Sequence, residues 1–213
     1  MKTFSNQYKK LRLYAIAVVL LTFGTASQAT LITSSTPTHN FAWNYNSGTA
    51  AGNLTGTGSM TVSGFNSSTL AMLISLNNTS GLPMDRLTAF GFGIDPNATS
   101  VTLVDANDGG MIGSSLSKIP GLALVEVCAF GGVNCAGGAN GGIFGGGSDI
   151  FQILLGGTWG NSVNIDPVGF KYQTGSGSFE FTVTTVPEPA TLSLLGIGLV
   201  GLVFLRRRKV LAN

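Results

Sequence analysis

Charged side chains are scarce in the middle of this 213-residue chain, and their scarcity limits the partners that it can bind. Between Thr30 and Val186 there are three basic and eight acidic residues, which gives this region a formal charge of −5. The other eight lysines and arginines lie near the two ends of the chain. Because nucleic-acid-binding proteins need clustered basic side chains to neutralise phosphates, we expect no nucleic acid among the partners.

Histidine is almost absent, since His39 is the only one in the chain. Nucleophilic triads depend on a histidine as base, and most zinc sites use histidine or further cysteines as ligands. The chain also lacks the patterns Gly-x-Ser-x-Gly and His-Glu-x-x-His. We therefore interpret His39 as a solvated loop residue, and we expect a protein that is not an enzyme and that holds no cofactor or metal.

Carboxylates are the remaining candidates for catalysis. Glu126, Asp149, Asp166 and Glu180 lie on or near expected strands, and two of them in one cleft could act as the acid and base of a glycosidase. Nothing in the sequence brings two of them together, and carboxylates are common on protein surfaces. A polysaccharide hydrolase is therefore the most distant of the functions considered.

Residues 105–110, Asp-Ala-Asn-Asp-Gly-Gly, resemble a calcium-binding loop in composition. An EF-hand needs Asp or Asn where Gly109 stands, and the later Glu of that motif is missing. We therefore expect a polar hairpin turn here, with calcium as a weak alternative.

Long apolar runs occur only near the two ends. Basic residues between Lys9 and Arg12 precede the first run, residues 13–23, and small residues such as Ser27 and Ala29 follow it. This is the architecture of a secretory signal peptide, which predicts cleavage by signal peptidase after Ala29. As a helix the run would span about 16 Å, too short for a bilayer core of about 30 Å. We therefore expect residues 1–29 to direct export.

The second apolar run, residues 190–205, is followed by four consecutive cations, Arg206, Arg207, Arg208 and Lys209. As a helix it would span about 24 Å, which suffices if the arginines snorkel and the bilayer thins locally. Cationic flanks of a membrane helix stay on the cytoplasmic side. We expect a transmembrane anchor that leaves the rest of the protein outside.

Pro187, Glu188 and Pro189 stand directly before that run. This proline motif, a short glycine-containing apolar span and an arginine cluster, in this order, resemble the PEP-CTERM sorting signal of Gram-negative bacteria. The resemblance implies recognition and processing by an exosortase near the prolines. It also implies an inner-membrane-anchored intermediate that faces the periplasm, followed by residence at the cell surface or in an exopolysaccharide-rich biofilm matrix.

Residues 30–186 are expected to form one all-β domain, flanked by the signal peptide (1–29) and the sorting segment (187–213). Short apolar–polar alternations recur between Gly, Asn, Ser and Pro, and no window shows sustained helical periodicity. This spacing favours a β-sandwich or jelly roll. The expected strands are 60–65, 70–76, 87–94, 101–104, 122–130, 150–155, 168–172 and 178–186.

Only two cysteines occur, Cys128 and Cys135, and an exported pair normally forms a disulfide. Nine of the seventeen residues 131–147 are glycine, which predicts a long flexible loop. This loop is either an inert spacer or a binding excursion at one end of the sandwich. Residues 128–138 also resemble the cistern-type PEP-CTERM subgroup.

Our leading hypothesis is a structural or interaction protein of the cell surface or exopolysaccharide matrix. The alternative is a carbohydrate-binding sandwich in which Trp43, Tyr45 or Trp159 stacks on sugar rings, although burial in the core would explain these residues equally well. The expected partners are signal peptidase, exosortase, the membrane and exopolysaccharide. Beyond these aromatic residues the sequence identifies no ligand-binding residue.

Overall fold

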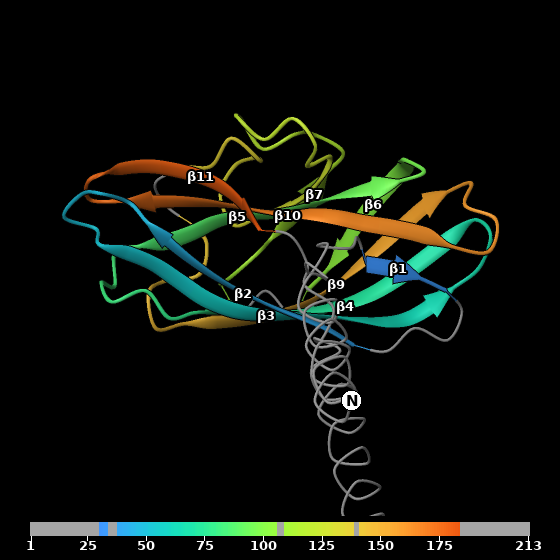
Figure 1. Cartoon of the computed structure of the whole chain (residues 1–213), viewed down its shortest axis with the longest axis horizontal. Coiled ribbons are helices and arrows are strands. Elements are labelled where there is room, and N and C mark those ends of the chain that lie inside the picture. The colour runs from blue at the N-terminus through green and yellow to red at the C-terminus, as the bar shows by residue number, and fades with distance from the viewer. Residues whose placement is uncertain (1–29, 34–37, 106–108, 139–140, 184–213) are drawn as a thin grey trace, which may run out of the picture.

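The computed structural model describes residues 30–33, 38–105, 109–138 and 141–183, so both expected addressing segments lie outside the described part of the chain. Within these ranges eleven strands form two antiparallel sheets that face each other, and there is no helix. Figure 1 shows the two sheets as stacked layers. The prediction of a single all-β sandwich is therefore confirmed.

Each sheet combines strands from both halves of the chain. Sheet A contains β1 (Thr30–Ile32), β5 (Arg86–Asp95), β7 (Gly113–Ser115), β8 (Val127–Phe130), β10 (Val163–Thr174) and β11 (Gly177–Val183). Sheet B contains β2 (His39–Asn46), β3 (Asn53–Phe65), β4 (Thr69–Asn78), β6 (Ala98–Val104) and β9 (Ser148–Gly157). The order in sheet A is β1-β10-β5-β8-β7, with β11 also on β10, and the order in sheet B is β2-β3-β4-β9-β6.

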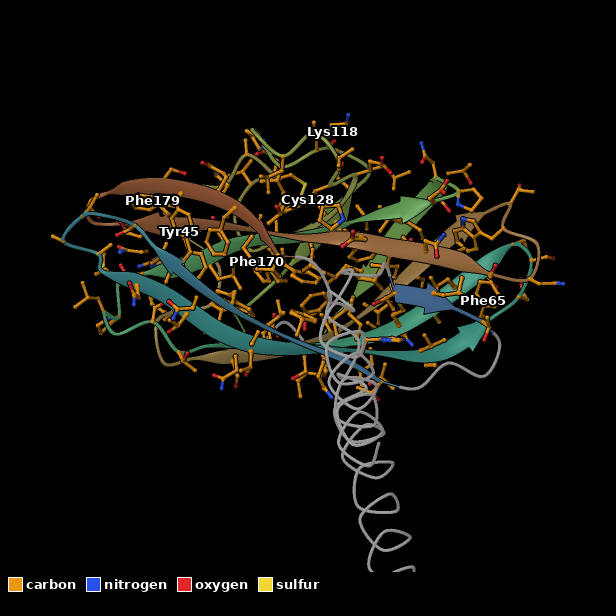
Figure 2. All side chains as sticks on the ribbon, in the orientation of Figure 1. Tyr45, Phe65, Lys118, Cys128, Phe170 and Phe179 are labelled. Atoms are coloured by element: carbon orange, nitrogen blue, oxygen red, sulfur yellow. A yellow bond between two sulfur atoms is a disulfide. The ribbon has the colours of Figure 1, made fainter. Side chains whose placement is uncertain are left out.

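Alternation along the strands of sheet B decides which side chains form the main core. In β4, Leu70, Met72, Ile74 and Leu76 point inward and are at most 1% exposed, while the residues between them face outward. Burial of each such side chain contributes about 1.5–3 kcal/mol. Figure 2 shows Phe170 of β10 reaching the same space from sheet A. The core is thus built from the inner faces of both sheets.

Sheet A, unlike sheet B, is covered on its outer face as well. In β5, Phe90 faces the main core, whereas Ala89 faces a second, smaller core that includes Ile119 and Val125. We call residues 116–126 and 131–138, which supply most of this cover, the outer layer. Figure 2 shows Lys118 of this layer on the side of sheet A that faces away from sheet B. The uninterrupted burial of residues 87–94 follows from this double cover.

The strand predictions are confirmed where alternation is clear and wrong in three ways. Strands β1, β2 and β7 were not predicted, and β3 and β10 begin several residues earlier than expected. Residues 122–126 are not a strand; they include a turn in which Val125 donates its N–H to Leu122 O at 3.2 Å. In β2, aromatic residues alternate with asparagine, a residue that usually marks turns, which hid this strand in the sequence.

Candidate functional site

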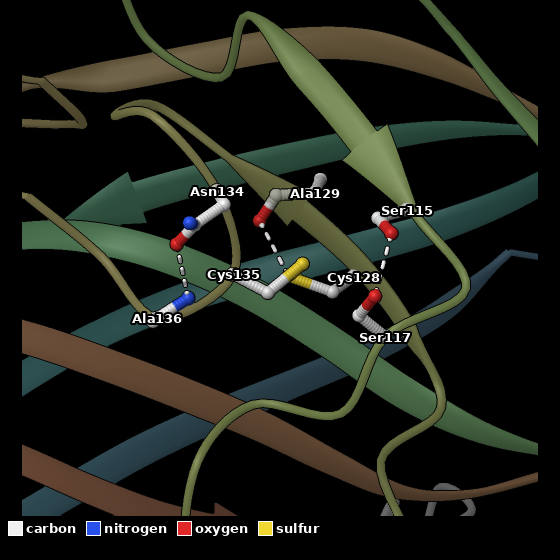
Figure 3. Close-up of a disulfide and its surroundings, with 7 residues drawn as sticks. All are labelled: Ser115, Ser117, Cys128, Ala129, Asn134, Cys135 and Ala136. Atoms are coloured by element: carbon white, nitrogen blue, oxygen red, sulfur yellow. Dashed lines mark hydrogen bonds between the residues drawn. A yellow bond between two sulfur atoms is a disulfide. The ribbon is translucent and has the colours of Figure 1, made fainter.

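Cys128 and Cys135 form the predicted disulfide, with their Cα atoms 6.1 Å apart. Both cysteines are buried in the second core beside Val125. Figure 3 shows the bond at the turn that follows β8, where Ala136 donates its N–H to Asn134 Oδ1 at 2.8 Å. The disulfide therefore ties the outer layer to sheet A.

The glycine segment, residues 131–147, packs as a strap on sheet A wherever it is described, through backbone contacts that the prediction of a flexible loop did not include. Gly131 donates its N–H to Thr88 O at 3.0 Å, and Leu87 and Ile143 exchange two backbone hydrogen bonds of 2.9 Å. Gly142 has a φ of +98°, and a Cβ added there would lie 2.2 Å from Leu87 O. Glycine serves here for close backbone approach, which composition alone cannot distinguish from flexibility.

Lys171 lies beneath this strap and is only 5% exposed. Its Nζ donates to Ser178 Oγ at 2.8 Å and forms an ion pair with Glu180 Oε1. A Cβ added to Gly137 would lie 2.7 Å from Lys171 Cε, so the lysine stem fills the space under that glycine. Glu180, one of the carboxylates considered for catalysis, thus has a structural partner that compensates a buried ammonium.

A second candidate carboxylate also has a structural role. Asp149 is 2% exposed, and its Oδ2 accepts the backbone N–H of Met111 at 2.6 Å. Glu126 and Asp166 are half-buried, and each has one buried oxygen without a hydrogen-bond partner. Across the described ranges, no group of three His, Cys, Asp or Glu side chains could hold a metal ion.

A small cavity lies between the outer layer and the start of β6. Its volume is about 220 Å³, and it is lined by Asn97, Ala98, Leu116, Lys118, Glu126 and Val127. Lys118 and Glu126 give it one charge of each sign, which suits water or a small polar solute. None of the other three carboxylates lines it, so it does not assemble the acid–base pair that glycoside hydrolysis needs.

The aromatic residues considered as sugar platforms are largely inside the sandwich. Trp43 and Trp159 are 3% and 4% exposed. Trp43 stacks on Phe170 with ring centroids 4.3 Å apart, and Trp159 Nε1 donates to Pro96 O at 2.9 Å. Tyr45 is half-buried and stacks against the rings of β11 (Figure 2). Stacking on these two tryptophans is therefore closed to a sugar ring.

His39 is the first residue of β2, so its interpretation as a loop residue is wrong. It is half-buried, its Nε2 is buried, and burial lowers the pKa of its imidazole.

Of the calcium-like segment, residues 106–108 lie outside the described residues, and the expected hairpin there stays a prediction. The adjacent Gly110 is buried against Asp149, where an added Cβ would lie 2.1 Å from Oδ2.

A buried polar network at one end of the sandwich was not predicted. Tyr172 OH accepts a hydrogen bond from Trp43 Nε1 at 2.9 Å and donates one to Asn78 Oδ1 at 3.0 Å. Asn78 Nδ2 donates to the backbone oxygens of Asp85 and Ile143 at 2.7 and 2.9 Å. Asp85 is 1% exposed, and burial raises the pKa of its carboxyl. The residues of this network lie far apart in the sequence, so no local pattern could have revealed it.

The two ends of the described body meet at one edge of sheet A. Strands β1 and β11 lie end to end along the same side of β10, because Thr30 pairs with Ile165 and Val183 pairs with Val168. Only two residues of β10 separate these pairings. Figure 1 shows β11 and β1 beside different parts of β10. The segments that precede Thr30 and follow Val183 therefore attach at neighbouring points.

The segment that follows β11 is the part of the chain with a recognisable match. Residues 185–209 match the family model of the PEP-CTERM protein-sorting motif. The chain carries a PEP-CTERM sorting signal. This signal implies an exported protein that passes through the membrane and is recognised by an exosortase. No curated protein and no solved structure matches the chain.

The matched segment begins two residues after Val183, the end of β11. It includes Pro187, Glu188 and Pro189 and the basic cluster at residues 206–209. The roles of these residues, the membrane span and cleavage after Ala29 stay predictions, because all of them lie outside the described residues. The described ranges themselves hold no helix of sufficient length and apolarity to cross a bilayer.

Proposed function

We propose that this PEP-CTERM protein is a non-catalytic structural or interaction component of the cell surface or of an exopolysaccharide matrix. It is exported with its signal peptide, held in the inner membrane by residues 190–205 with the body in the periplasm, and processed by an exosortase near Pro187 to Pro189. The motif match at residues 185–209, directly after the edge strand β11, is the observation that carries this proposal.

The position of the motif supports exosortase access. Val183 ends an edge strand, so the chain leaves the sandwich at its periphery. Three residues separate Val183 from Pro187, the first proline of the motif. Prolines bias the preceding residue to an extended form and cannot donate a backbone hydrogen bond. This sequence bias favours binding of the motif by a processing enzyme of the membrane.

The chemistry of the body supports a non-catalytic role. Two of the four candidate carboxylates have structural partners, and the cavity beside Glu126 contains no second carboxylate. The disulfide suits an oxidising compartment outside the cytoplasm.

Intact mass measurement of the protein from its producing strain tests the sorting proposal. We expect the wild-type chain at the surface to start at Thr30 and to lack the tail beyond the proline motif. The double variant Pro187→Ala/Pro189→Ala should keep the tail and remain in the membrane fraction. The matched control Pro83→Ala/Pro120→Ala, which changes two exposed prolines of the body, should be processed normally. A surface-located wild-type chain with its tail intact would refute processing.

A second measurement tests the matrix role separately. In a strain that no longer makes exopolysaccharide, the processed protein should be released into the medium instead of sedimenting with the matrix. Unchanged sedimentation of a correctly processed protein would contradict the matrix association while leaving exosortase sorting intact.

A further inference from the structure

The outer face of sheet B carries no charge. In the five strands of this sheet, all of which are described, Asp149 is the only Asp, Glu, Lys or Arg, and it points into the sandwich with 2% exposure. Sheet A differs, since its strands include Arg86, Asp95 and Lys171 among others. The charge of the body therefore lies on sheet A and in the loops.

Four exposed aliphatic side chains gather on this uncharged face. Leu73, Val104, Ile150 and Leu154 are 44%, 49%, 56% and 39% exposed. They come from β4, β6 and β9, which are adjacent, and both Leu73 and Val104 pair in register with Gln152. Their side chains point outward because the residues between them, such as those of β9, alternate into the core. Together they form one apolar cluster around Gln152.

Hydroxyl and amide side chains continue the face beyond this cluster. In β3 the outward positions include Thr57, Ser59 and Thr61, and in β2 they include Asn40 and Asn44. These groups can exchange hydrogen bonds with an uncharged partner without the desolvation cost of a charge. The surface is thus apolar at one side and polar but neutral at the other.

We infer that a second copy of this chain packs on the outer face of sheet B, related by a two-fold axis near Gln152. Two copies share the acidic excess of residues 30–186, so they repel each other overall, whereas contact through this face opposes no charge to another. A two-fold contact is self-complementary, so the aliphatic cluster of one copy meets that of the other. Sheets that pack face to face in this way lie about 10 Å apart.

The size of the face fits such a contact. Five strands spaced by about 4.8 Å and about ten residues long give a face of about 24 by 33 Å, or about 800 Å² per copy. A two-fold pair would therefore bury about 1,600 Å² in total, which is the usual size of a specific interface.

A glycan is a weaker occupant of the same face. Sugar rings stack on aromatic faces. The aromatic residues of β2 and β9 on the core side, Phe41, Trp43 and Phe151, are at most 7% exposed and face away from this surface.

The two ends of the described body, Thr30 and Val183, lie at the edge of sheet A, so pairing through sheet B does not block the sorting segment.

Photo-crosslinking of the full chain in its producing cells tests the inference. We expect Gln152→p-benzoylphenylalanine to give a product of twice the chain mass, in which the joined peptides both come from sheet B. Val133→p-benzoylphenylalanine, at an 84% exposed position of the outer layer, is the matched control and should give no such product. Adding Leu154→Lys to the position-152 chain should reduce the dimer product at least about tenfold, because each copy would place an ammonium group without a partner in a desolvated contact.

The outcomes separate the possible occupants. Crosslinks from position 152 to a glycan, to another protein or to residues 184–213 of the same chain would overturn the inference, as would the absence of any crosslink. Val133→Lys serves as the control for an added charge, and it should leave the dimer product unchanged. An unchanged denaturation midpoint and an intact disulfide in Leu154→Lys show that the loss reflects association. Exosortase processing can be scored in the same samples, so a failure of sorting is distinguishable from a failure of pairing.

Discussion

At the scale of single residues, Tyr172 joins the two sheets through its hydroxyl. It accepts from Trp43 on β2 and donates to Asn78 on β4, at 2.9 and 3.0 Å. Tyr172→Phe leaves both partners buried without this bond, so we expect a loss of about 1–3 kcal/mol in the free energy of unfolding. Urea denaturation of the mature protein measures it. Tyr45→Phe, which removes a hydroxyl from a half-buried ring outside this network, should have a smaller effect, and equal losses would contradict the network's role.

Asp85 gives the fold a pH dependence of definite sign. Burial raises the pKa of its carboxyl above the ordinary value of 3.8, so the folded state binds the proton more tightly than the unfolded state. Its contribution to stability is therefore lost as pH rises from the ordinary value through the folded-state pKa. Asp85→Asn should raise the denaturation midpoint at neutral pH, and this gain should vanish below about pH 4. The exposed Asp95→Asn is the control, and a gain independent of pH would refute the argument.

The identity of single residues predicted the disulfide but not the aromatic packing. Cys128 and Cys135 are the only cysteines, so export leaves one intramolecular pairing. Trp43 and Trp159 each suit a core and a sugar platform equally, because both settings use a large ring with a polar edge. Whether these tryptophans are buried depends on which strands pair with each other, and strands that are far apart in the sequence leave no local pattern.

At the scale of elements, the glycine strap depends on backbone contact. Gly142 and Gly146 both have positive φ, +98° and +82°, but an added Cβ meets Leu87 O at Gly142 and nothing within 4 Å at Gly146. Gly142→Ala should therefore cost about 1–3 kcal/mol more than Gly146→Ala, since both share the strain of positive φ and only one overlaps. Thermal denaturation of the two variants compares them directly. Equal costs would mean that the strap is not held against β5.

The disulfide fixes the outer layer rather than the whole sandwich, because it closes a short loop beside the second core. Cys128→Ser/Cys135→Ser should lower the free energy of unfolding by about 2.5 kcal/mol on the chain-entropy model. Limited proteolysis should cut first within residues 131–138. Ser115→Ala, which removes one hydroxyl of the exposed pair in Figure 3, is the control and should leave the cleavage pattern unchanged. Cleavage spread evenly over both sheets would contradict a local role.

Strands with an exposed face could be predicted, and those with unusual surroundings could not. β4, β9 and β11 alternate because one side of each strand packs into the core and the other side carries the more exposed residues. β1 and β7 have three residues each, too few for a periodic signal. Residues 122–126 are apolar because they cover sheet A from outside, so their composition imitates a strand. The cover itself depends on contacts between distant segments.

At the scale of the whole molecule, the separation of charge from sheet B predicts an association that salt does not weaken. If pairing occurs through this face, raising the NaCl concentration from about 0.05 to about 0.5 M should not lower the dimer fraction, because no ion pair is available there to be screened and the repulsion between two acidic bodies becomes weaker. Crosslinking yield at position 152 measures this fraction. A severalfold fall in yield would instead indicate a contact made through the charged loops.

The two ends of the described body, Thr30 and Val183, lie close together beside β10. Thr30 and Val183 pair with positions of β10 that are three residues apart, a distance of about 10 Å along a strand. A short linker could join them, and a circularly permuted chain could then begin at an exposed turn such as the one between β10 and β11. For the same reason the sandwich could be inserted into a surface loop of another protein without separating the two ends of that loop.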